Sequence, residues 1–269
     1  MNDEIIKKWD NFSKIINCSN NNNFNVVYFH AFTGSYKNKN FIINKLNNCN
    51  FYGFDMPGHG ETLINDEKSI SIVNYLNLAI EFIQDFNINN IVLMGHSMGG
   101  GIANSIAINP LIKNRIKKII LEAPANPASS TNYETIIKYL VPNNVDEMKL
   151  VGGELFYDPI KFFGGEKSYD RFINFEFNRL LQKKYLRKII DIPNQKILND
   201  RCLESIKTID IPSLLILGSD DKIIPYNESI EYFNKNSNYK ICKINQTKHV
   251  PIAEKSDECI KLINEFINS

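Results

Sequence analysis

The fold is decided by one stretch of the chain, Ile91-Val92-Leu93-Met94-Gly95-His96-Ser97-Met98-Gly99-Gly100. Four apolar residues run directly into a Gly-x-Ser-x-Gly pattern, and small and apolar residues follow at helical spacing over 101–107. This order predicts a buried strand, a sharp turn and a helix. Such a turn lifts a serine hydroxyl to the top of a sheet in a strained backbone conformation. Side chains two residues before and after the serine would collide, which explains the glycines at both positions.

The turn is also typical of a nucleophilic serine. The helix that follows directs its N-terminus at Ser97, and this favours negative charge that develops there. By itself Gly-x-Ser-x-Gly is a weak pattern, because a glycine-rich turn can contain a serine by chance. Between a buried strand and a helix, the catalytic interpretation is the favoured one.

The whole chain has the composition of a globular protein. Its 269 residues suit one large domain or one domain with an insertion, and a hydrophobic content of 43% is enough for a sizeable core. The net charge of +1 gives no indication of binding to nucleic acid or to an anionic membrane. No apolar run approaches the roughly 18 residues of a membrane span. The first residues also lack the basic and apolar regions of a signal peptide.

The cysteines do not indicate a disulfide framework or a metal site. They are odd in number, scattered and without metal-ligand spacing: Cys18, Cys49, Cys202, Cys242 and Cys259. We expect them to be small core residues in a reducing compartment. The sequence therefore predicts a cytoplasmic protein without a metal ion.

Strands and helices alternate along most of the chain. Strands are predicted over 25–30, 51–55, 91–94, 116–121, 211–218 and 239–244, after a β-hairpin over 4–9 and 12–18 that could instead be an amphipathic helix. Helices are predicted over about 36–46, with Ser35 as its cap, and over 70–86, 228–233 and 257–267. This alternation predicts an α/β protein with a mostly parallel, doubly wound sheet of about eight strands and helices on both faces.

The alternation stops between residues 126 and 207. Helical pieces are predicted near 133–141 and 169–190, with glycine pairs between them. We interpret 126–207 as a helical cap inserted over the top of the sheet, and 1–125 with 208–269 as the core.

A nucleophilic serine needs a base within hydrogen-bond reach, and the base needs a carboxylate that orients it. In a doubly wound sheet, reactive groups gather at the carboxyl ends of strands. His249 follows the last predicted strand, but His30 and His59 also follow strands, so position alone does not decide between them. His96 is adjacent to Ser97, where neighbouring side chains diverge, and is a poor base for it.

The candidate carboxylates are the adjacent Asp220 and Asp221, just after the strand that ends at Gly218. The residues alone do not separate them. One could orient the histidine while the other caps the next turn.

Together these motifs resemble the α/β-hydrolase family, and the resemblance extends from the first strands to the last helix. The family's chain order is serine, acid, histidine, which implies a triad of Ser97, Asp221 and His249. The family's acid lies in a Gly-x-x-Asp stretch followed by proline four residues later. Gly218 and Pro225 place Asp221 in that register and Asp220 one residue early.

The resemblance also implies an oxyanion hole. The family's oxyanion strand usually ends in His-Gly followed by a large apolar residue, whereas here the sequence reads His30-Ala31-Phe32. By resemblance, the backbone N–H groups of Phe32 and Met98 bind the oxyanion. Ala31 in place of glycine is a departure from the pattern. The loop 55–60 resembles the family's loop after its fourth strand, where Asp55 and His59 would have structural roles.

The implied function is that of a carboxylesterase or lipase that cleaves small or medium acyl esters without a cofactor, as a monomer or homodimer. His96 and Met98 around Ser97 resemble the esterase, lipase and monoacylglycerol-lipase branches. Iminopeptidases more often carry Gly-Gly-Ser-Trp-Gly. The alternatives are a prolyl iminopeptidase, thioesterase or acyltransferase of the same fold, and a non-catalytic binding protein. An intact triad argues against the last of these.

The cap would shape the substrate pocket. Its aromatic residues are Tyr133, Tyr139, Phe156, Tyr157, Phe162, Phe163, Phe172, Phe175 and Phe177. Candidates for an apolar substrate pocket are Phe156, Tyr157, Phe162 and Phe172, although we expect most cap aromatics to pack the cap onto the sheet. Cap carboxylates such as Glu147, Glu154 and Glu176 could bind a substrate amine, but solvated helix faces are the favoured interpretation.

Overall fold

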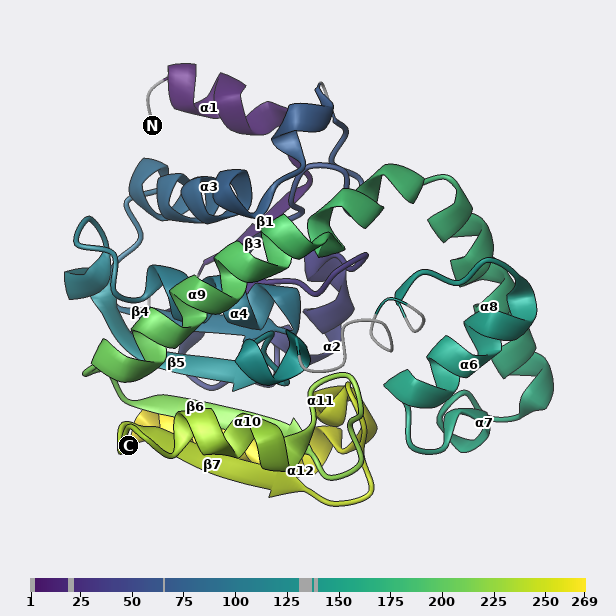
Figure 1. The fold of residues 1–269 in the computed structure, drawn as a ribbon. Helices are drawn as coiled ribbons and strands as arrows, with labels where there is room; N and C mark the ends of the chain where they lie inside the picture. Colours follow the sequence, from purple (N-terminus) through teal and green to yellow (C-terminus); the bar gives the residue numbers. More distant parts are fainter. Residues whose placement is uncertain (1–2, 19–21, 65, 131–136, 138–139) are drawn as a thin grey trace.

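The computed structural model describes residues 3–18, 22–64, 66–130, 137 and 140–269. In this part of the chain, seven strands form one sheet in the order β1-β3-β2-β4-β5-β6-β7 (Figure 1). Only β1 is antiparallel to its neighbour. The strands are β1 (Lys14–Asn17), β2 (Phe24–Phe29), β3 (Cys49–Phe54), β4 (Ile91–His96), β5 (Ile116–Glu122), β6 (Ser213–Gly218) and β7 (Tyr239–Ile244). This is the predicted α/β-hydrolase fold.

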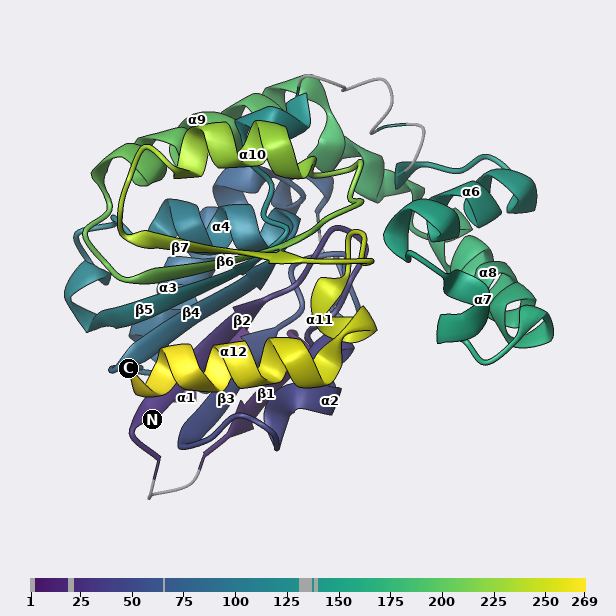
Figure 2. The same cartoon turned by 90° about the horizontal axis from the view of Figure 1, so that it is seen from below.

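Successive strand residues point to opposite faces of the sheet, and both faces are covered. In β4, Ile91 and Leu93 pack into one buried cluster, whereas Val92 and Met94 pack into the other. The first face is covered by α3 (Ile72–Asp85), α4 (Met98–Ile106), α9 (Ile192–Thr208) and α10 (Tyr226–Phe233). The second is covered by α2 (Asn40–Ile43), α11 (Pro251–Glu254) and α12 (Ser256–Asn268) (Figure 2).

The N-terminal segment differs from the predicted hairpin. Its first arm is a helix, α1 (Asp3–Asp10), so the described sheet has seven strands instead of about eight. The neighbouring side chains of Lys8 and Trp9 both reach α3, where they contact Asp85 at 2.7 and 2.9 Å. In a strand, adjacent side chains would point to opposite faces. Helical geometry lets both face α3, and the alternative of an amphipathic helix is therefore correct here.

The predicted helix over 36–46 is shorter than expected. A 3₁₀ turn, η1 (Tyr36–Lys39), is followed by the single turn of α2. Ser35 caps η1 as predicted, because its hydroxyl accepts the N–H of Lys37 at 3.2 Å. Two further 3₁₀ turns, η2 (Glu67–Ser69) and η3 (Lys113–Arg115), lie in loops of the core.

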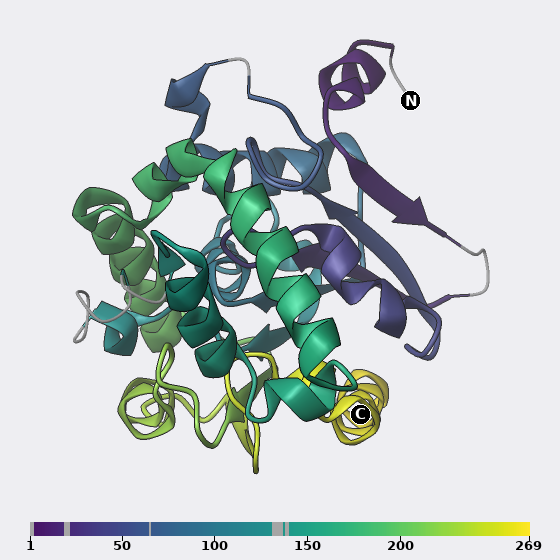
Figure 3. The same cartoon turned by 90° about the vertical axis from the view of Figure 1, so that its right-hand side faces the viewer.

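The segment predicted as a cap begins with η4 (Pro127–Ser130) and continues with α6 (Val145–Leu155), α7 (Pro159–Phe162), α8 (Glu166–Leu181) and η5 (Lys184–Ile190). The helix predicted near 133–141 lies mostly outside the described residues, as do Tyr133 and Tyr139. Helices α6, α7 and α8 lie beyond the carboxyl ends of the strands, in front of the sheet in Figure 3. Helix α9 packs on α4 and α3, in the helical layer of the core. The cap boundaries 126 and 207 stay a prediction.

Trp9 tests the attachment of α1. We expect Trp9→Ala to lower the free energy of unfolding by about 3–5 kcal/mol, because a fully buried indole in contact with Phe54 and Phe82 is lost. Trp9→Phe keeps a ring in place and should cost only about 1–2 kcal/mol, for the lost hydrogen bond to Asp85. Urea unfolding followed by circular dichroism measures both, and an unchanged midpoint in Trp9→Ala would contradict the packing described here.

Candidate active site

Ser97 lies at the turn between β4 and α4 with φ 52° and ψ −119°. This is a rare conformation for a residue with a side chain, and such positions usually persist only where the surroundings impose them. The surroundings here are three backbone hydrogen bonds. The Ser97 N–H donates to the Glu122 carbonyl at 3.0 Å, and its carbonyl accepts from Gly101 at 3.0 Å and Ala125 at 2.8 Å. The turn is therefore fixed from β5 as well as from its own helix.

The two glycines of the motif are required by close backbone approach. A Cβ atom on Gly95 would lie 2.2 Å from the carbonyl oxygen of Gly99, and one on Gly99 would lie 2.1 Å from that of Phe29 in β2. No side chain fits at either position without moving a backbone. The predicted collision is confirmed. Gly99 in addition lies close to the backbone of the neighbouring strand β2.

Asp221 and His249 form a buried pair at the carboxyl ends of β6 and β7. The Nδ1 atom of His249 lies 2.8 Å from Oδ2 of Asp221, and the two residues are 3% and 5% exposed. The other carboxylate oxygen accepts the N–H groups of Ile223 and Ile224 at 2.8 and 2.9 Å. A carboxylate held in this way accepts a hydrogen bond from the Nδ1–H group, which leaves Nε2 of His249 available as a base.

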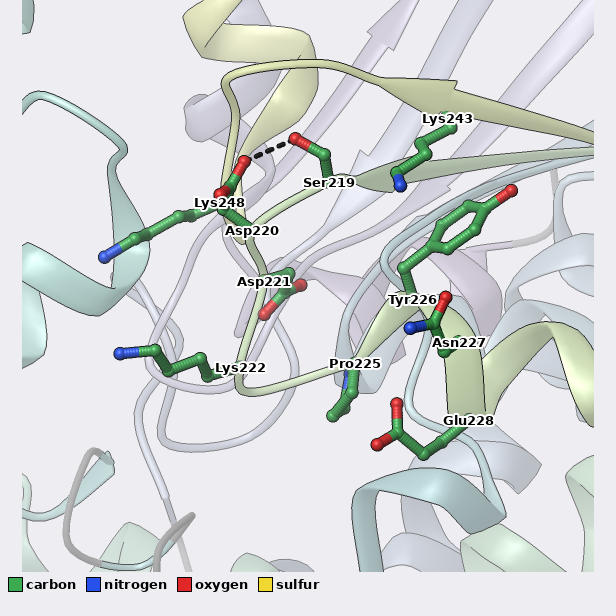
Figure 4. Close-up of a pocket in the computed structure, with 10 residues that line it drawn as sticks. All are labelled: Ser219, Asp220, Asp221, Lys222, Pro225, Tyr226, Asn227, Glu228, Lys243 and Lys248. Atoms are coloured by element: carbon green, nitrogen blue, oxygen red, sulfur yellow. Dashed lines mark hydrogen bonds between the residues drawn. The ribbon is translucent and has the colours of Figure 1, made fainter.

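Asp220 points elsewhere. Its side chain is exposed and accepts a hydrogen bond from the Ser219 hydroxyl, and its N–H donates to the Thr247 carbonyl at 3.0 Å (Figure 4). The structure therefore brings Asp221, and not Asp220, to His249. The two aspartates that the sequence alone did not separate have different partners.

Phe32 and Met98, the predicted oxyanion donors, lie beside Ser97. All three residues line one small hollow, and neither N–H donates to another group in the part of the chain that the structure describes. The positive φ of this loop falls on Thr33, at 59°, and not on Ala31. Ala31 does not have a positive φ, so this position does not require the glycine that the family usually has.

The described residues show no hydrogen bond between the Ser97 hydroxyl and His249. In enzymes without substrate, catalytic hydrogen bonds are often long or poorly aligned, and they tighten when substrate binds. The geometry thus supplies a serine on a strained turn, an oriented imidazole and two free N–H donors at the same edge of the sheet.

His30 and His59 lie beneath the loop that carries Phe32. His30 accepts the N–H of Met56 at Nε2 (2.9 Å) and donates from Nδ1 to the Ala31 carbonyl (2.8 Å). Burial lowers the pKa of both histidines, so both are neutral near pH 7. Their rings are 4.9 Å apart, and they support the loop instead of acting on substrate.

Asp55 has the structural position that the resemblance implied. Its carboxylate accepts the N–H groups of Tyr36 at 2.8 Å and Glu61 at 3.2 Å. A Cβ atom on Gly60 would lie 1.8 Å from this carboxylate, which explains glycine there. Asp55 thus joins the loop after β3 to the start of η1.

A buried network beneath His249 was missed by sequence reasoning. His96 donates from Nε2 to the His249 carbonyl at 2.8 Å, and burial lowers the pKa of His96 to about 4. Glu122, fully buried at the end of β5, accepts the N–H of Ile252 at 3.0 Å and pairs with Lys39 of η1 at 2.6 Å. The one available signal was a charged residue directly after the apolar residues 119–121 at the end of a predicted strand.

The electrostatics of Glu122 follow from this pairing. Burial by itself would raise the pKa of its carboxyl, but the positive charge of Lys39 and the proximity of His96 hold the pKa below its usual value. Glu122 is therefore ionised near pH 7. Because Lys39 follows the Phe32 loop and Ile252 follows His249, one ion pair ties together the two loops that surround Ser97.

Helices α6 and α8, from the segment predicted as a cap, contact both loops. Arg179 of α8 donates to the Thr33 carbonyl at 2.7 Å, and Lys183 donates to the carbonyls of Gly58 and Gly60 at 3.0 and 2.7 Å. At the other end, the N–H of His249 donates to the Leu155 carbonyl at 3.1 Å.

The cap aromatics pack mainly with one another. Phe156, Phe162 and Phe172 join one ring cluster, in which the centroids of Phe156 and Phe162 are 4.6 Å apart, and Tyr157 is 45% exposed. None of these four lines the hollow beside Ser97. Its walls are mostly aliphatic, from residues the sequence did not single out: Leu140, Ile189, Ile190, Leu198, Ile223 and Ile224.

A larger hollow of about 460 Å³ lies outside the acid loop (Figure 4). Lysines and acidic residues both line it, and Ser97, Phe32 and Met98 do not. Within the described residues, no group of three His, Cys, Asp or Glu side chains could hold a metal ion. In the same part of the chain, no helix has the length and apolar character that crossing a bilayer requires.

Comparisons with known proteins agree with this fold. A family model described as the alpha/beta hydrolase fold matches residues 25–156. The protein named "Putative esterase/lipase 1" in Mycoplasma pneumoniae is 29% identical over 246 residues, which are 90% of each chain. Its namesake in Mycoplasma genitalium is also 29% identical, over 90% of each chain. The solved structure of a "putative lipase" from Acinetobacter baumannii AYE shares the fold, with a TM-score of 0.79 at 21% identity over 97% of this chain and 93% of that one.

The Lys39–Glu122 pair is open to a direct test. Glu122→Gln leaves the Lys39 ammonium buried without a counter-charge, and we expect a loss of about 3–5 kcal/mol in the free energy of unfolding. The double variant Lys39→Met/Glu122→Gln removes both charges and should recover most of that loss. Urea unfolding of the two variants and the wild type measures the difference. Equal losses in the single and double variants would contradict a coupled buried pair.

Proposed function

We propose that this chain, which belongs to the α/β-hydrolase superfamily, is a serine hydrolase that cleaves carboxylic esters. The fold by itself supports many chemistries, so the proposal depends on the site. The observation that carries it is the buried Asp221–His249 pair at the same edge of the sheet as the strained Ser97 turn. The names of the two Mycoplasma relatives support ester bonds as the target.

In the proposed reaction, Ser97 Oγ attacks the ester carbonyl while Nε2 of His249 takes the hydroxyl proton. The tetrahedral intermediate collapses to an acyl-enzyme, and His249 gives the proton to the leaving alcohol. Water, deprotonated by the same imidazole, then attacks the acyl-enzyme and releases the acid and free Ser97. Asp221 keeps Nδ1 protonated and stabilises the imidazolium that forms in each step.

The N–H groups of Phe32 and Met98 would stabilise the oxyanion. Both are fixed before substrate arrives, one by the loop bound to Arg179 and the other by the start of α4. In a well-studied protease, removal of one such donor costs about 3–4 kcal/mol of transition-state stabilisation. Because both donors are backbone groups, side-chain variants at these positions would not remove them.

The surroundings of the cap carboxylates favour an ester over a substrate amine. Glu147 accepts hydrogen bonds from Asn143, Glu154 pairs with Lys222 at 3.2 Å, and Glu176 pairs with Arg179. Each carboxylate thus has a partner within the chain. An aminopeptidase needs a carboxylate free to receive the substrate amine. The aliphatic walls beside Ser97 suit instead the chain of a small or medium acyl group.

The first test is hydrolysis of p-nitrophenyl esters, from acetyl to palmitoyl, by the wild type and by Ser97→Ala. We expect turnover that peaks at short or medium acyl chains in the wild type. In Ser97→Ala, kcat should fall by about 10⁶-fold, as in other serine hydrolases that lose the nucleophile.

Proline and alanine p-nitroanilides serve as the comparison substrates. Turnover of the anilides alone would move the assignment to an aminopeptidase. Ester turnover that persists in Ser97→Ala would exclude the proposed nucleophile.

The paired aspartates give a matched test of the acid. Asp221→Asn removes the carboxylate that orients His249, and we expect kcat to fall by roughly 10⁴-fold, because the imidazole loses its productive tautomer. Asp220→Asn changes the same charge one residue away and should leave kcat within a few-fold. Circular dichroism checks that both variants fold. Similar losses in the two variants would argue against Asp221 as the orienting group.

A further inference from the structure

We propose that this site takes esters whose alcohol part carries an anionic group, which Lys184 and Arg187 bind. This inference rests on the proposed ester hydrolysis and names the substrate class. It starts from a second hollow, which Phe32 also lines. Phe32 and Leu140 belong to the walls of both hollows, so the two are neighbours in the site.

The second hollow has apolar walls and a basic side. Leu180, Leu181 and Leu186 contribute apolar surface, and Lys183, Lys184 and Arg187 contribute the only charged groups among its described lining residues. Among the described residues that line the hollow beside Ser97, none is charged. The two hollows thus differ in charge although they share Phe32.

The basic residues come from one run in a nearly neutral chain. Between 177 and 190 there are five lysines and arginines and no acidic residue: Arg179, Lys183, Lys184, Arg187 and Lys188. Over the whole chain, 31 basic residues nearly balance 30 acidic ones. A local excess of this kind creates a positive potential that draws anions.

Three of the five have partners in the core loops. Arg179 donates to the Thr33 carbonyl and pairs with Glu176, Lys183 donates to the carbonyls of the loop after β3, and Lys188 donates to the Glu67 carbonyl at 3.3 Å. These bonds hold η5 against the core. They also fix the wall of the hollow beside the proposed oxyanion donor.

Lys184 and Arg187 are the two basic residues of this run that do not bind the core loops among the described residues. Among the described residues neither forms a hydrogen bond, an ion pair or a ring contact, and both side chains are exposed. They line the hollow and lie one turn apart on the same 3₁₀ segment. Two exposed cations that line an apolar hollow suit a carboxylate or a phosphate, and the arginine can bind either one through two parallel hydrogen bonds.

The placement decides which part of the ester carries the anion. The aliphatic hollow at Ser97 suits the acyl chain, which stays attached to the serine in the proposed reaction. The alcohol part would then extend past Phe32 toward Lys184. By contrast, the larger hollow in Figure 4 mixes Lys222, Lys243 and Lys248 with Asp220 and Glu228, and it carries no comparable preference for an anion.

The test compares two esters of the same shape, 4-butyryloxybenzoate and 4-butyryloxybenzamide. The ratio of their kcat/KM values is measured in the wild type and in Lys184→Gln/Arg187→Gln. We expect the ratio of anion to amide to fall by roughly 3- to 30-fold in the variant, as two partly exposed ion pairs predict. The fall should shrink as salt is added, because exposed charge pairs are screened.

The matched control is Lys161→Gln/Lys167→Gln, which removes two cap lysines that do not line the hollow. Both double variants remove two positive charges, so the comparison separates a local contact with the anion from a long-range attraction of the anion to the protein. An unchanged ratio in the control supports the proposal. An equal fall in both double variants overturns it, and so does an unchanged ratio in Lys184→Gln/Arg187→Gln.

A second pair of substrates distinguishes the source of the anion. Release of octanoate from 1-octanoylglycerol 3-phosphate and from 1-octanoylglycerol is compared in the same proteins. A ratio that falls only for this pair identifies a glycerophosphate, and one that falls only for the benzoate pair identifies a small carboxylate. If neither ratio falls while the neutral esters are cleaved in a Ser97-dependent way, the anion site is wrong and the hydrolase stands. If neither the neutral nor the anionic esters are cleaved, both proposals fail.

Discussion

The close approach of α4 to β4 and β2 is the constraint on which the rest of the site depends. Glycines at 95 and 99 let the helix begin directly against the Phe29 carbonyl, where any side chain would overlap the backbone. Ser97 is forced to a positive φ as a result, and its three backbone bonds reach Glu122, Gly101 and Ala125. Strain at this turn is offset by these bonds and by the buried strands around it, and Ser97 remains partly exposed at the edge of the sheet.

Beneath that edge, a buried ion pair holds two loops in place that the strands alone do not fix. Lys39 and Glu122 are both buried, and their pairing joins the segment after Phe32 to the segment after His249. A buried ion pair is weak evidence for added stability, because desolvation offsets much of the attraction. Its geometric effect is clearer, because it fixes the positions of two separate loops relative to each other. Arg179 and Lys183 add a similar link from the cap.

The fold was largely predictable because its signals are local. Apolar runs bounded by turn formers gave the parallel strands, and Gly-x-Ser-x-Gly in a strand–turn–helix frame located the turn at Ser97. The first arm of the expected hairpin was wrong because the segment 3–10 has no local preference strong enough to exclude either structure. The contact of Trp9 with Phe54 and Phe82, far away in sequence, decides in favour of a helix.

The sequence by itself determined the alternation of strands and helices after the N-terminal segment, and the serine turn with its glycines, because each depends on residues close together in the chain. It also limited the acid to Asp220 or Asp221. The family resemblance implied Asp221, but only the tertiary structure shows that Asp221 meets His249, since that depends on how two loops at different strand ends fold over each other. The same holds for the Glu122 pair and for the walls of the two hollows. Such contacts join distant segments, and no pattern within one segment encodes them.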